Sequence, residues 1–265
     1  MLLLHQVVRV DPRRAERELR TLAAVIKRVA MVQATEVALM ASVAARAPLR
    51  LTGTGIESMR PPLPPTQLPG SPVLLVHGFC GTKSSLSPIA HCLSAQGLTV
   101  DTITYTPFGT SVERLADRLV AAVYRILAET GSDKVHLVGH SLGGVVIAQA
   151  IADGRLDGLV DTVVTLGSPF GGSPWANLLP FGEVVRALRD GSPLLRRLAT
   201  APAQDGVRWL VLTATQDLVV PGLRSVPAHA KVHAVTVGGV GHLGMLLSRR
   251  VVKQVVGHIL DAAAA

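Results

Sequence analysis

The sequence predicts an α/β protein with a mostly parallel sheet and helices on both faces of that sheet. Short, continuous apolar runs, as expected of strands that are buried on both faces, alternate with longer segments of helical periodicity. One such run, Val135–Val138, leads directly into a Gly-x-Ser-x-Gly turn at residues 139–143 and then into a helix. A strand, a sharp turn and a helix in this order are typical of a nucleophile elbow, which holds a serine clear of the backbone. The alternative is an ordinary turn that happens to carry a serine.

Length and composition limit the possible classes of protein. The chain has 265 residues, 48% of them hydrophobic, so it can bury a core as one domain. Its net charge is +8, but the basic residues are dispersed and only four Phe, two Tyr and two Trp are available for stacking, so we expect no nucleic acid partner. The two cysteines, Cys80 and Cys92, are too few for a disulfide framework or a zinc site. We expect two thiols, with a single bridge as the alternative.

Residues 1–47 are predicted to form an N-terminal amphipathic helix, with the helix itself over about residues 11–47. Residues 1–28 hold seven basic residues against three acidic ones, so half of the net charge lies in this segment. Packing on its own domain or self-association is the first interpretation, and contact with a membrane surface is the alternative. A spanning helix is not expected, because Gln33 and Glu36 would sit near its middle. Without a clear cleavable signal peptide, a cytoplasmic or peripheral membrane location is favoured, but the sequence leaves the localisation open.

A linker and then a catalytic domain are predicted after this helix. Residues 48–70 are dense in proline and glycine, which is typical of a linker, and the domain then covers residues 71–265. Its strands are expected at Pro72–Val76, which is a short continuous apolar run, and at Thr99–Thr104, Val135–Val138, Thr162–Leu166, Trp209–Ala214 and Val232–Val237. Its helices are expected at Ser85–Gln96, at Val112–Glu129, at Leu142–Ala152 as an amphipathic helix, and after the glycine-rich loop at residues 238–244, ending at about Leu260.

The alternation of strands and helices stops over residues 168–206. This stretch predicts a small helical lid insertion of one or two helices, broken around Gly191–Pro193. Because it follows the carboxyl end of a strand, where α/β proteins build their binding crevices, we interpret it as a lid or acyl-pocket wall. Ordinary helical packing is the alternative. Phe170, Trp175 and Leu178 are its candidate substrate-binding residues.

Three side chains are candidates for nucleophilic catalysis. Ser141 is the candidate nucleophile, and a serine needs a base to take its proton and an acid to orient that base. His242 is the best base, because it follows the last strand in a glycine-rich loop. Asp217 is the best acid, because it lies just past a strand end, whereas the fallback acids Asp190 and Asp205 lie within or just after the insertion. The order serine, aspartate, histidine is the one expected of this architecture.

The oxyanion that forms during acyl transfer needs hydrogen-bond donors beside the nucleophile. We expect the backbone N–H groups of Phe79, in the loop after the first core strand, and of Leu142, directly after the nucleophile. Main-chain donors need no particular side chain, so both side chains are free to shape the pocket wall. His77 opens the first of these loops, and the elbow holds His140 beside the nucleophile.

These motifs together resemble the bacterial lipases and esterases of the α/β-hydrolase superfamily, over about residues 71–260. The resemblance implies an α/β-hydrolase fold and a Ser–Asp–His mechanism on carboxylic esters or lipids, with neither a cofactor nor an essential metal. The N-terminal helix and the proline-rich linker are not part of this pattern. The motifs that carry the resemblance are His77–Gly81, Gly139–Gly144, the Gly167–Pro169 loop, the Asp217 loop and Gly241–His242.

Other functions remain open from the sequence. An acyltransferase, a thioesterase or an amidase would use the same residues and the same acyl-enzyme. A hydrolase fold without activity could serve as a membrane-associated binding protein, but such a protein typically lacks one of the three catalytic side chains, and all three types are present here.

Overall fold

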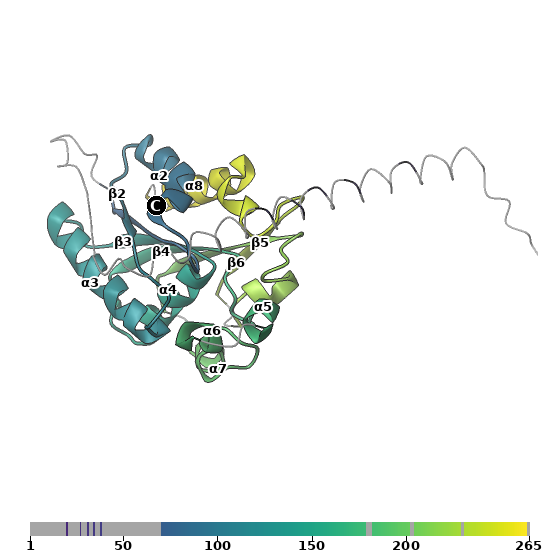
Figure 1. Cartoon of the computed structure of the whole chain (residues 1–265). Helices are drawn as coiled ribbons and strands as arrows, with labels where there is room; N and C mark the ends of the chain where they lie inside the picture. Colours follow the sequence, from purple (N-terminus) through teal and green to yellow (C-terminus); the bar gives the residue numbers. More distant parts are fainter. Residues whose placement is uncertain are drawn as a thin grey trace, which may run out of the picture.

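The computed structural model contains one parallel sheet. The structure describes residues 70–178, 182–201, 204–228 and 231–263, and five single positions nearer the N-terminus, at residues 20, 27, 31, 34 and 38. Within these residues the strand order is β2-β1-β3-β4-β5-β6, and all five pairings are parallel. Helices surround this sheet (Figure 1), which confirms the predicted fold class. The strands are β1 (Val73–Val76), β2 (Val100–Ile103), β3 (Val135–His140), β4 (Val160–Leu166), β5 (Arg208–Ala214) and β6 (His233–Val237).

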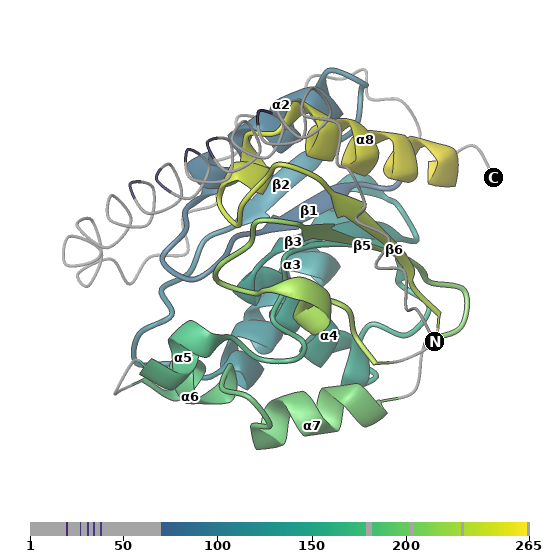
Figure 2. The same cartoon turned by 90° about the vertical axis from the view of Figure 1, so that its right-hand side faces the viewer.

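Helices cover both faces of the sheet. Two of them, α2 (Ser87–Ser94) and α8 (Arg249–Ala263), lie on one face, and α3 (Val112–Thr130) and α4 (Leu142–Ala152) lie on the other (Figure 2). The helix expected from Ser85 instead begins as the 3₁₀ helix η2 (Lys83–Leu86), and α2 follows with Pro88 in its first turn, where the missing proline N–H is not needed. Two further 3₁₀ helices are η3 (Gly222–Ser225) and η4 (Gly244–Leu246).

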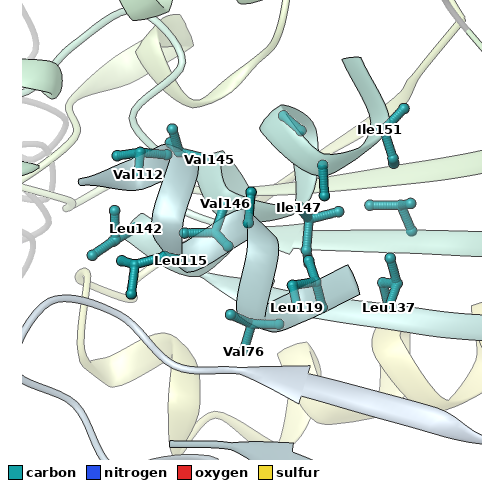
Figure 3. Packing of buried hydrophobic residues seen from close by; sticks show 14 of the residues in the cluster. Val76, Val112, Leu115, Leu119, Leu137, Leu142, Val145, Val146, Ile147 and Ile151 are labelled. Atoms are coloured by element: carbon teal, nitrogen blue, oxygen red, sulfur yellow. The ribbon is translucent and has the colours of Figure 1, made fainter. Parts of the chain in front are cut away.

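The helix α4 is buried all round, so the expectation of an amphipathic helix was wrong. Every residue from Leu142 to Ile151 is buried, because α4 contacts the sheet on one side and the helices α3 and α7 on the other. Figure 3 shows Val146 and Ile147 of α4 beside apolar side chains of α3. Two glycines allow its first turn to approach the sheet closely. A Cβ on Gly143 would lie 2.2 Å from the carbonyl oxygen of Val76, and one on Gly144 would lie 2.0 Å from Ser168 Oγ. The helix that follows the Gly-x-Ser-x-Gly turn is therefore fixed within the core.

The strand order places a crevice at one edge of the sheet. From β1 the chain crosses to β2 on one side, and from β3 onward the strands are added on the other side of β1. In open α/β sheets, ligands bind beyond the carboxyl ends of the strands where the order reverses. The loops after β1 and β3 are therefore neighbours, and they are the loops that carry Phe79 and Ser141.

The segment between β4 and β5 contains three short helices among its described residues, where one or two were predicted. They are α5 (Pro174–Leu178), α6 (Glu183–Ala187) and α7 (Pro193–Thr200). The break around Gly191–Pro193 is where the sequence predicts it, and a second break precedes α6 at Gly182, which has a φ of 101°. The boundaries of this insertion as a lid stay a prediction.

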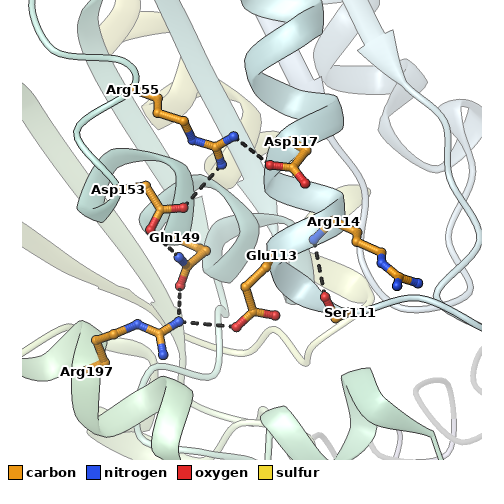
Figure 4. Close-up of polar contacts among 8 residues, drawn as sticks. All are labelled: Ser111, Glu113, Arg114, Asp117, Gln149, Asp153, Arg155 and Arg197. Carbon is orange, nitrogen blue, oxygen red and sulfur yellow. Dashed lines mark hydrogen bonds and ion pairs between the residues drawn. The ribbon is translucent and has the colours of Figure 1, made fainter.

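Polar side chains attach α7 to the helices beneath it (Figure 4). Arg197 of α7 donates to Oε1 of the buried Gln149 in α4 at 2.8 Å and to Oε1 of Glu113 in α3 at 3.2 Å. The amide of Gln149 in turn donates to Asp153 at 2.6 Å. Because a buried amide needs its partners, these contacts fix α7 on the body of the protein.

The predicted N-terminal helix and the linker lie outside the described residues, except for Gly70 and the five single positions. Those five positions are helical and exposed. Their interpretation stays a prediction. Among the helices that the structure describes, none is long and apolar enough to cross a membrane.

Candidate active site

Ser141 lies at the turn between β3 and α4 in a strained conformation. Its φ is 53° and its ψ is −121°, and only one other described residue besides glycine, Cys80, has a positive φ. Such a backbone costs on the order of 1–3 kcal/mol and persists only where the surrounding structure imposes it. Here Gly139 permits it, since a Cβ at this position would lie 2.6 Å from the backbone nitrogen of Gly144. The turn therefore has the geometry of a nucleophile elbow.

His242 and Asp217 form a buried pair. Nδ1 of His242 lies 2.8 Å from Oδ2 of Asp217, and both residues are about 4% exposed. The other carboxylate oxygen, Oδ1, accepts hydrogen bonds from the backbone N–H groups of Val219 at 2.8 Å and Val220 at 2.7 Å. The loop after β5 thus holds the carboxylate in place. A carboxylate at Nδ1 favours the proton on that nitrogen and leaves Nε2 of His242 as the basic atom.

The two fallback acids lie elsewhere. Asp190 pairs with Arg224 at 2.6 Å, and Asp205 is 91% exposed and pairs with Lys231 at 2.7 Å. The structure therefore brings Asp217 to His242, and neither of the other two aspartates takes part in this pair.

Gly167, directly after β4, lies against the Asp217–His242 pair. A Cβ on this glycine would lie 3.0 Å from Oδ2 of Asp217 and 3.1 Å from Nδ1 of His242, and the φ of Gly167 is 54°. In the sequence, Gly167 belongs to one of the loops that carry the resemblance, but nothing there predicts its contact with Asp217 and His242. A glycine immediately after a buried strand is otherwise too common to identify a site.

His140 connects the elbow to the loop of His242. Its Nε2 lies 3.1 Å from the backbone carbonyl oxygen of His242, so this nitrogen is the donor. Burial and, to a smaller extent, the nearby His242 ring together lower the pKa of His140 to about 3, so the side chain is neutral. A neutral imidazole in this position holds the backbone of the candidate base without adding a charge beside it.

The two predicted oxyanion donors belong to segments that meet at Ser141. A Cβ on Gly78 would lie 3.0 Å from Cβ of Ser141, so the loop that carries Phe79 contacts the nucleophile directly. Leu142 is the first residue of α4, and the first N–H groups of a helix have no carbonyl partner within it. Cys80 and Cys92 are both thiols and form no disulfide with each other, as expected from the sequence.

A cavity of about 450 Å³ opens at these residues. Both Ser141 and His242 line it, and its remaining wall is mainly apolar; the described residues that line it include no Asp, Glu, Lys or Arg. Residues from the loop after β2, from η2, from α6 and from the loops after β5 and β6 contribute, among them Phe108, Leu86, Val185, Leu188, Val219 and Leu246.

Of the three candidate substrate-binding residues, the structure places only Trp175 in this wall. Its indole Nε1 donates to the carbonyl oxygen of Leu218 at 2.9 Å, which fixes the ring at the rim. Phe170 is buried in the core instead, edge-to-face on Trp209 with 6.1 Å between ring centroids. Leu178 is 76% exposed and does not line the cavity. Phe108 also lines the cavity, although the sequence did not identify it as a substrate-binding residue.

Metal ligands do not gather in the part of the chain that the structure describes. No group of three or more His, Cys, Asp or Glu side chains there could hold a metal ion.

Comparisons with known proteins agree with this fold. Residues 71–225 match the family described as alpha/beta hydrolase fold. A triacylglycerol lipase of Vibrio cholerae is 35% identical over 129 residues, which are 45% of this chain and 40% of the lipase. A triacylglycerol lipase of Pseudarthrobacter phenanthrenivorans is 32% identical over 116 residues, 41% of this chain and 36% of that protein. The matches thus cover less than half of the length of either relative.

Solved structures show the same fold at low sequence identity. The mature lipase of Bacillus licheniformis superposes with a TM-score of 0.63 and 18% identity, over 72% of this chain and 94% of that chain. Lipase B of Aspergillus fumigatus superposes with a TM-score of 0.64 and 16% identity, over 73% of this chain and 53% of the other.

Proposed function

The chain belongs to the alpha/beta hydrolase fold family, and from this premise we propose that it is a serine hydrolase that cleaves carboxylic esters. The observation that carries the proposal is the shared cavity: Ser141, on its strained turn, and His242, bound through Nδ1 to Asp217, line the same apolar pocket. The similarity to triacylglycerol lipases supports the same reaction class.

In the proposed first step, Oγ of Ser141 attacks the carbonyl carbon of the ester. The hydroxyl proton passes to Nε2 of His242, and Asp217 stabilises the imidazolium that forms. The backbone N–H groups of Phe79 and Leu142 bind the negative charge that develops on the carbonyl oxygen. When the tetrahedral intermediate collapses, the proton on His242 goes to the departing alkoxide and leaves Ser141 acylated.

A water molecule reverses these roles in the second step. His242 takes a proton from the water, the hydroxide attacks the acyl carbon, and the proton returns to Ser141 as the carboxylic acid leaves. The buried carboxylate of Asp217 serves both steps, because it keeps the histidine in one orientation and one tautomer.

The wall of the cavity supports a neutral, apolar acyl group. Apolar side chains make up most of the wall around the nucleophile, and a charged acyl group would have to lose its hydration there without a carboxylate, ammonium or guanidinium partner among the described lining residues. The substrate class that we propose is therefore an uncharged carboxylic ester or lipid.

The test is hydrolysis of p-nitrophenyl esters from acetate to palmitate. We expect activity in the wild type and a loss of at least about 10³-fold in kcat for Ser141→Ala. Ser132→Ala is the matched control, since Ser132 is a half-buried serine outside the cavity, and this variant should retain full activity. A folded wild type without activity on every ester of the series would overturn the proposal.

A further inference from the structure

Tyr105 is a buried polar residue that the proposed reaction does not use. It follows β2, is 8% exposed, and stacks on the ring of His77 with 4.2 Å between ring centroids and 22° between the ring planes. Burial raises the pKa of Tyr105, so its hydroxyl stays protonated and can act as a donor. A phenylalanine would supply the same ring for packing. The buried hydroxyl therefore needs a separate explanation.

Tyr105 and His77 are joined by two hydrogen bonds. The hydroxyl of Tyr105 donates to the backbone carbonyl of His77. The backbone N–H of Tyr105 donates to Nε2 of His77 at 3.3 Å. Because Nε2 accepts this bond, the ring proton of the neutral imidazole is on Nδ1, and Nδ1 then donates to the carbonyl oxygen of Gly78 at 2.9 Å.

The carbonyl of Gly78 is thus bound by two donors. Besides Nδ1 of His77, the backbone N–H of Gly81 donates to it at 3.0 Å and closes a tight turn over residues 78–81. The C=O of Gly78 and the N–H of Phe79 belong to one planar, trans peptide unit, so they point in opposite directions. When the carbonyl is held on the side of His77, the N–H of Phe79 is held on the opposite side.

That N–H is one of the two proposed oxyanion donors. The loop that carries it lies against the nucleophile, as the 3.0 Å distance between Cβ of Ser141 and a Cβ built on Gly78 indicates. Donors stabilise an oxyanion best when their direction is fixed before the reaction begins. In this structure the fixed direction depends on the side chain of Tyr105, which lies in the loop after β2 and contributes no atom to the proposed reaction.

We propose that Tyr105 is a positioning residue of the oxyanion hole, acting through His77 and the peptide of Gly78 and Phe79. The assignment rests on the proposed ester hydrolysis. Loss of the hydroxyl leaves the carbonyl of His77 without this buried donor, and the peptide that carries the Phe79 N–H is then less well fixed.

The experiment compares Tyr105→Phe with the wild type, with Tyr124→Phe as the matched control. Tyr124 is 55% exposed, lies in α3, and its hydroxyl donates to the carbonyl of Arg155 at 3.3 Å, away from the cavity. We expect kcat of Tyr105→Phe to fall by about 10-fold with KM changed less than about 2-fold, because the affected interaction is made in the transition state. Tyr124→Phe should retain wild-type values.

Two further readouts separate positioning from loss of structure. An alkyl trifluoromethyl ketone, which forms a tetrahedral oxyanion adduct on a reactive serine, should bind Tyr105→Phe more weakly by about the same factor as kcat/KM falls. The pH profile of kcat/KM should keep its shape, because His242 and Asp217 are untouched. A general loosening of the site would instead raise KM.

A second pair of variants tests the link itself if Tyr105→Phe does not fold. His77→Asn keeps a donor near the position of Nδ1, and His77→Gln keeps an acceptor near the position of Nε2. We expect His77→Asn to retain at least about 5-fold more kcat than His77→Gln, since only the former can hold the carbonyl of Gly78.

The outcomes distinguish the two proposals. A wild type without activity on any ester overturns the ester hydrolysis and, with it, the role of Tyr105. If the wild type is active, two results overturn the role of Tyr105 and leave the ester hydrolysis standing. One is an unchanged kcat and ketone affinity in Tyr105→Phe, and the other is equal activity in the two His77 variants.

Discussion

Substitution of Gly167 by alanine tests whether the Asp217–His242 pair sets the rate of the proposed reaction. The new Cβ would lie 3.0 Å from Oδ2 of Asp217 and 3.1 Å from Nδ1 of His242, whereas ordinary contacts begin at 3.4 Å. One or both partners must therefore move by about 0.4 Å. Misplacement of a catalytic group by about 1 Å can cost about 10²-fold, so a shift of this size should lower kcat by about 10-fold.

The same substitution also has a cost in stability that must be separated from its effect on the site. The φ of Gly167 is 54°, and a residue with a Cβ in this region costs about 1–2 kcal/mol. Gly158 is the matched control, because its φ is 75° and no atom lies within 4 Å of a Cβ built there. Both alanine variants should lose similar stability in urea denaturation.

Only the first variant should lose activity. We would measure kcat on p-nitrophenyl butyrate for Gly167→Ala and Gly158→Ala at a temperature at which both are folded. Equal kcat values in the two variants would refute the reasoning, since the contact with the Asp217–His242 pair would then have no effect on the rate.

Three further predictions concern stability and the N-terminal segment. Burial lowers the pKa of His136 to about 4, so between pH 6.5 and 4 the unfolded chain binds a proton that the folded protein does not. The free energy of unfolding should therefore fall by up to about 3 kcal/mol as the pH is lowered from 6.5 to 4. In urea titrations, His136→Leu should show a smaller fall over the same pH range. Arg197→Met should lower the free energy of unfolding by about 1–2 kcal/mol, because Oε1 of the buried Gln149 loses the donor that Arg197 supplies. Arg114→Met, on the exposed face of α3, is the control, and equal thermal midpoints of the two variants would contradict the prediction. If residues 11–47 bind a membrane surface, the full chain should float with anionic liposomes and a variant without residues 1–70 should not, and equal flotation would exclude that role.

The sequence was sufficient for the sheet and for the order of its elements. The inner strands β1, β3, β4 and β5 are largely buried apolar runs, and such runs can be recognised in the sequence because both faces of a parallel sheet are buried. The edge strands β2 and β6 are more polar and less buried. The helix α3 was equally clear, since Ser111 caps its N-terminus and Gly131 ends it with a φ of 68°. These signals are local.

What the sequence did not predict depends on contacts between distant segments. Phe170 was interpreted as a pocket residue, but it packs on Trp209 in the core, and no local pattern distinguishes the two environments. The amphipathic interpretation of α4 was wrong because α3 and, from the insertion, α7 cover the face of α4 that points away from the sheet. Gly167 and Tyr105 gain their importance from neighbours 50 and 28 residues away, respectively, at Asp217 and His77.

The most direct test of the central claim is to find the residue that becomes covalently modified. The folded protein is incubated with a fluorophosphonate, which reacts with activated serines, and the site of the adduct is found by peptide mass mapping. We predict a single adduct on Ser141 that is absent from Ser141→Ala and forms at least about 10²-fold more slowly in His242→Ala. An unlabelled wild type, or an adduct on another residue, would contradict the proposal that Ser141 is the nucleophile.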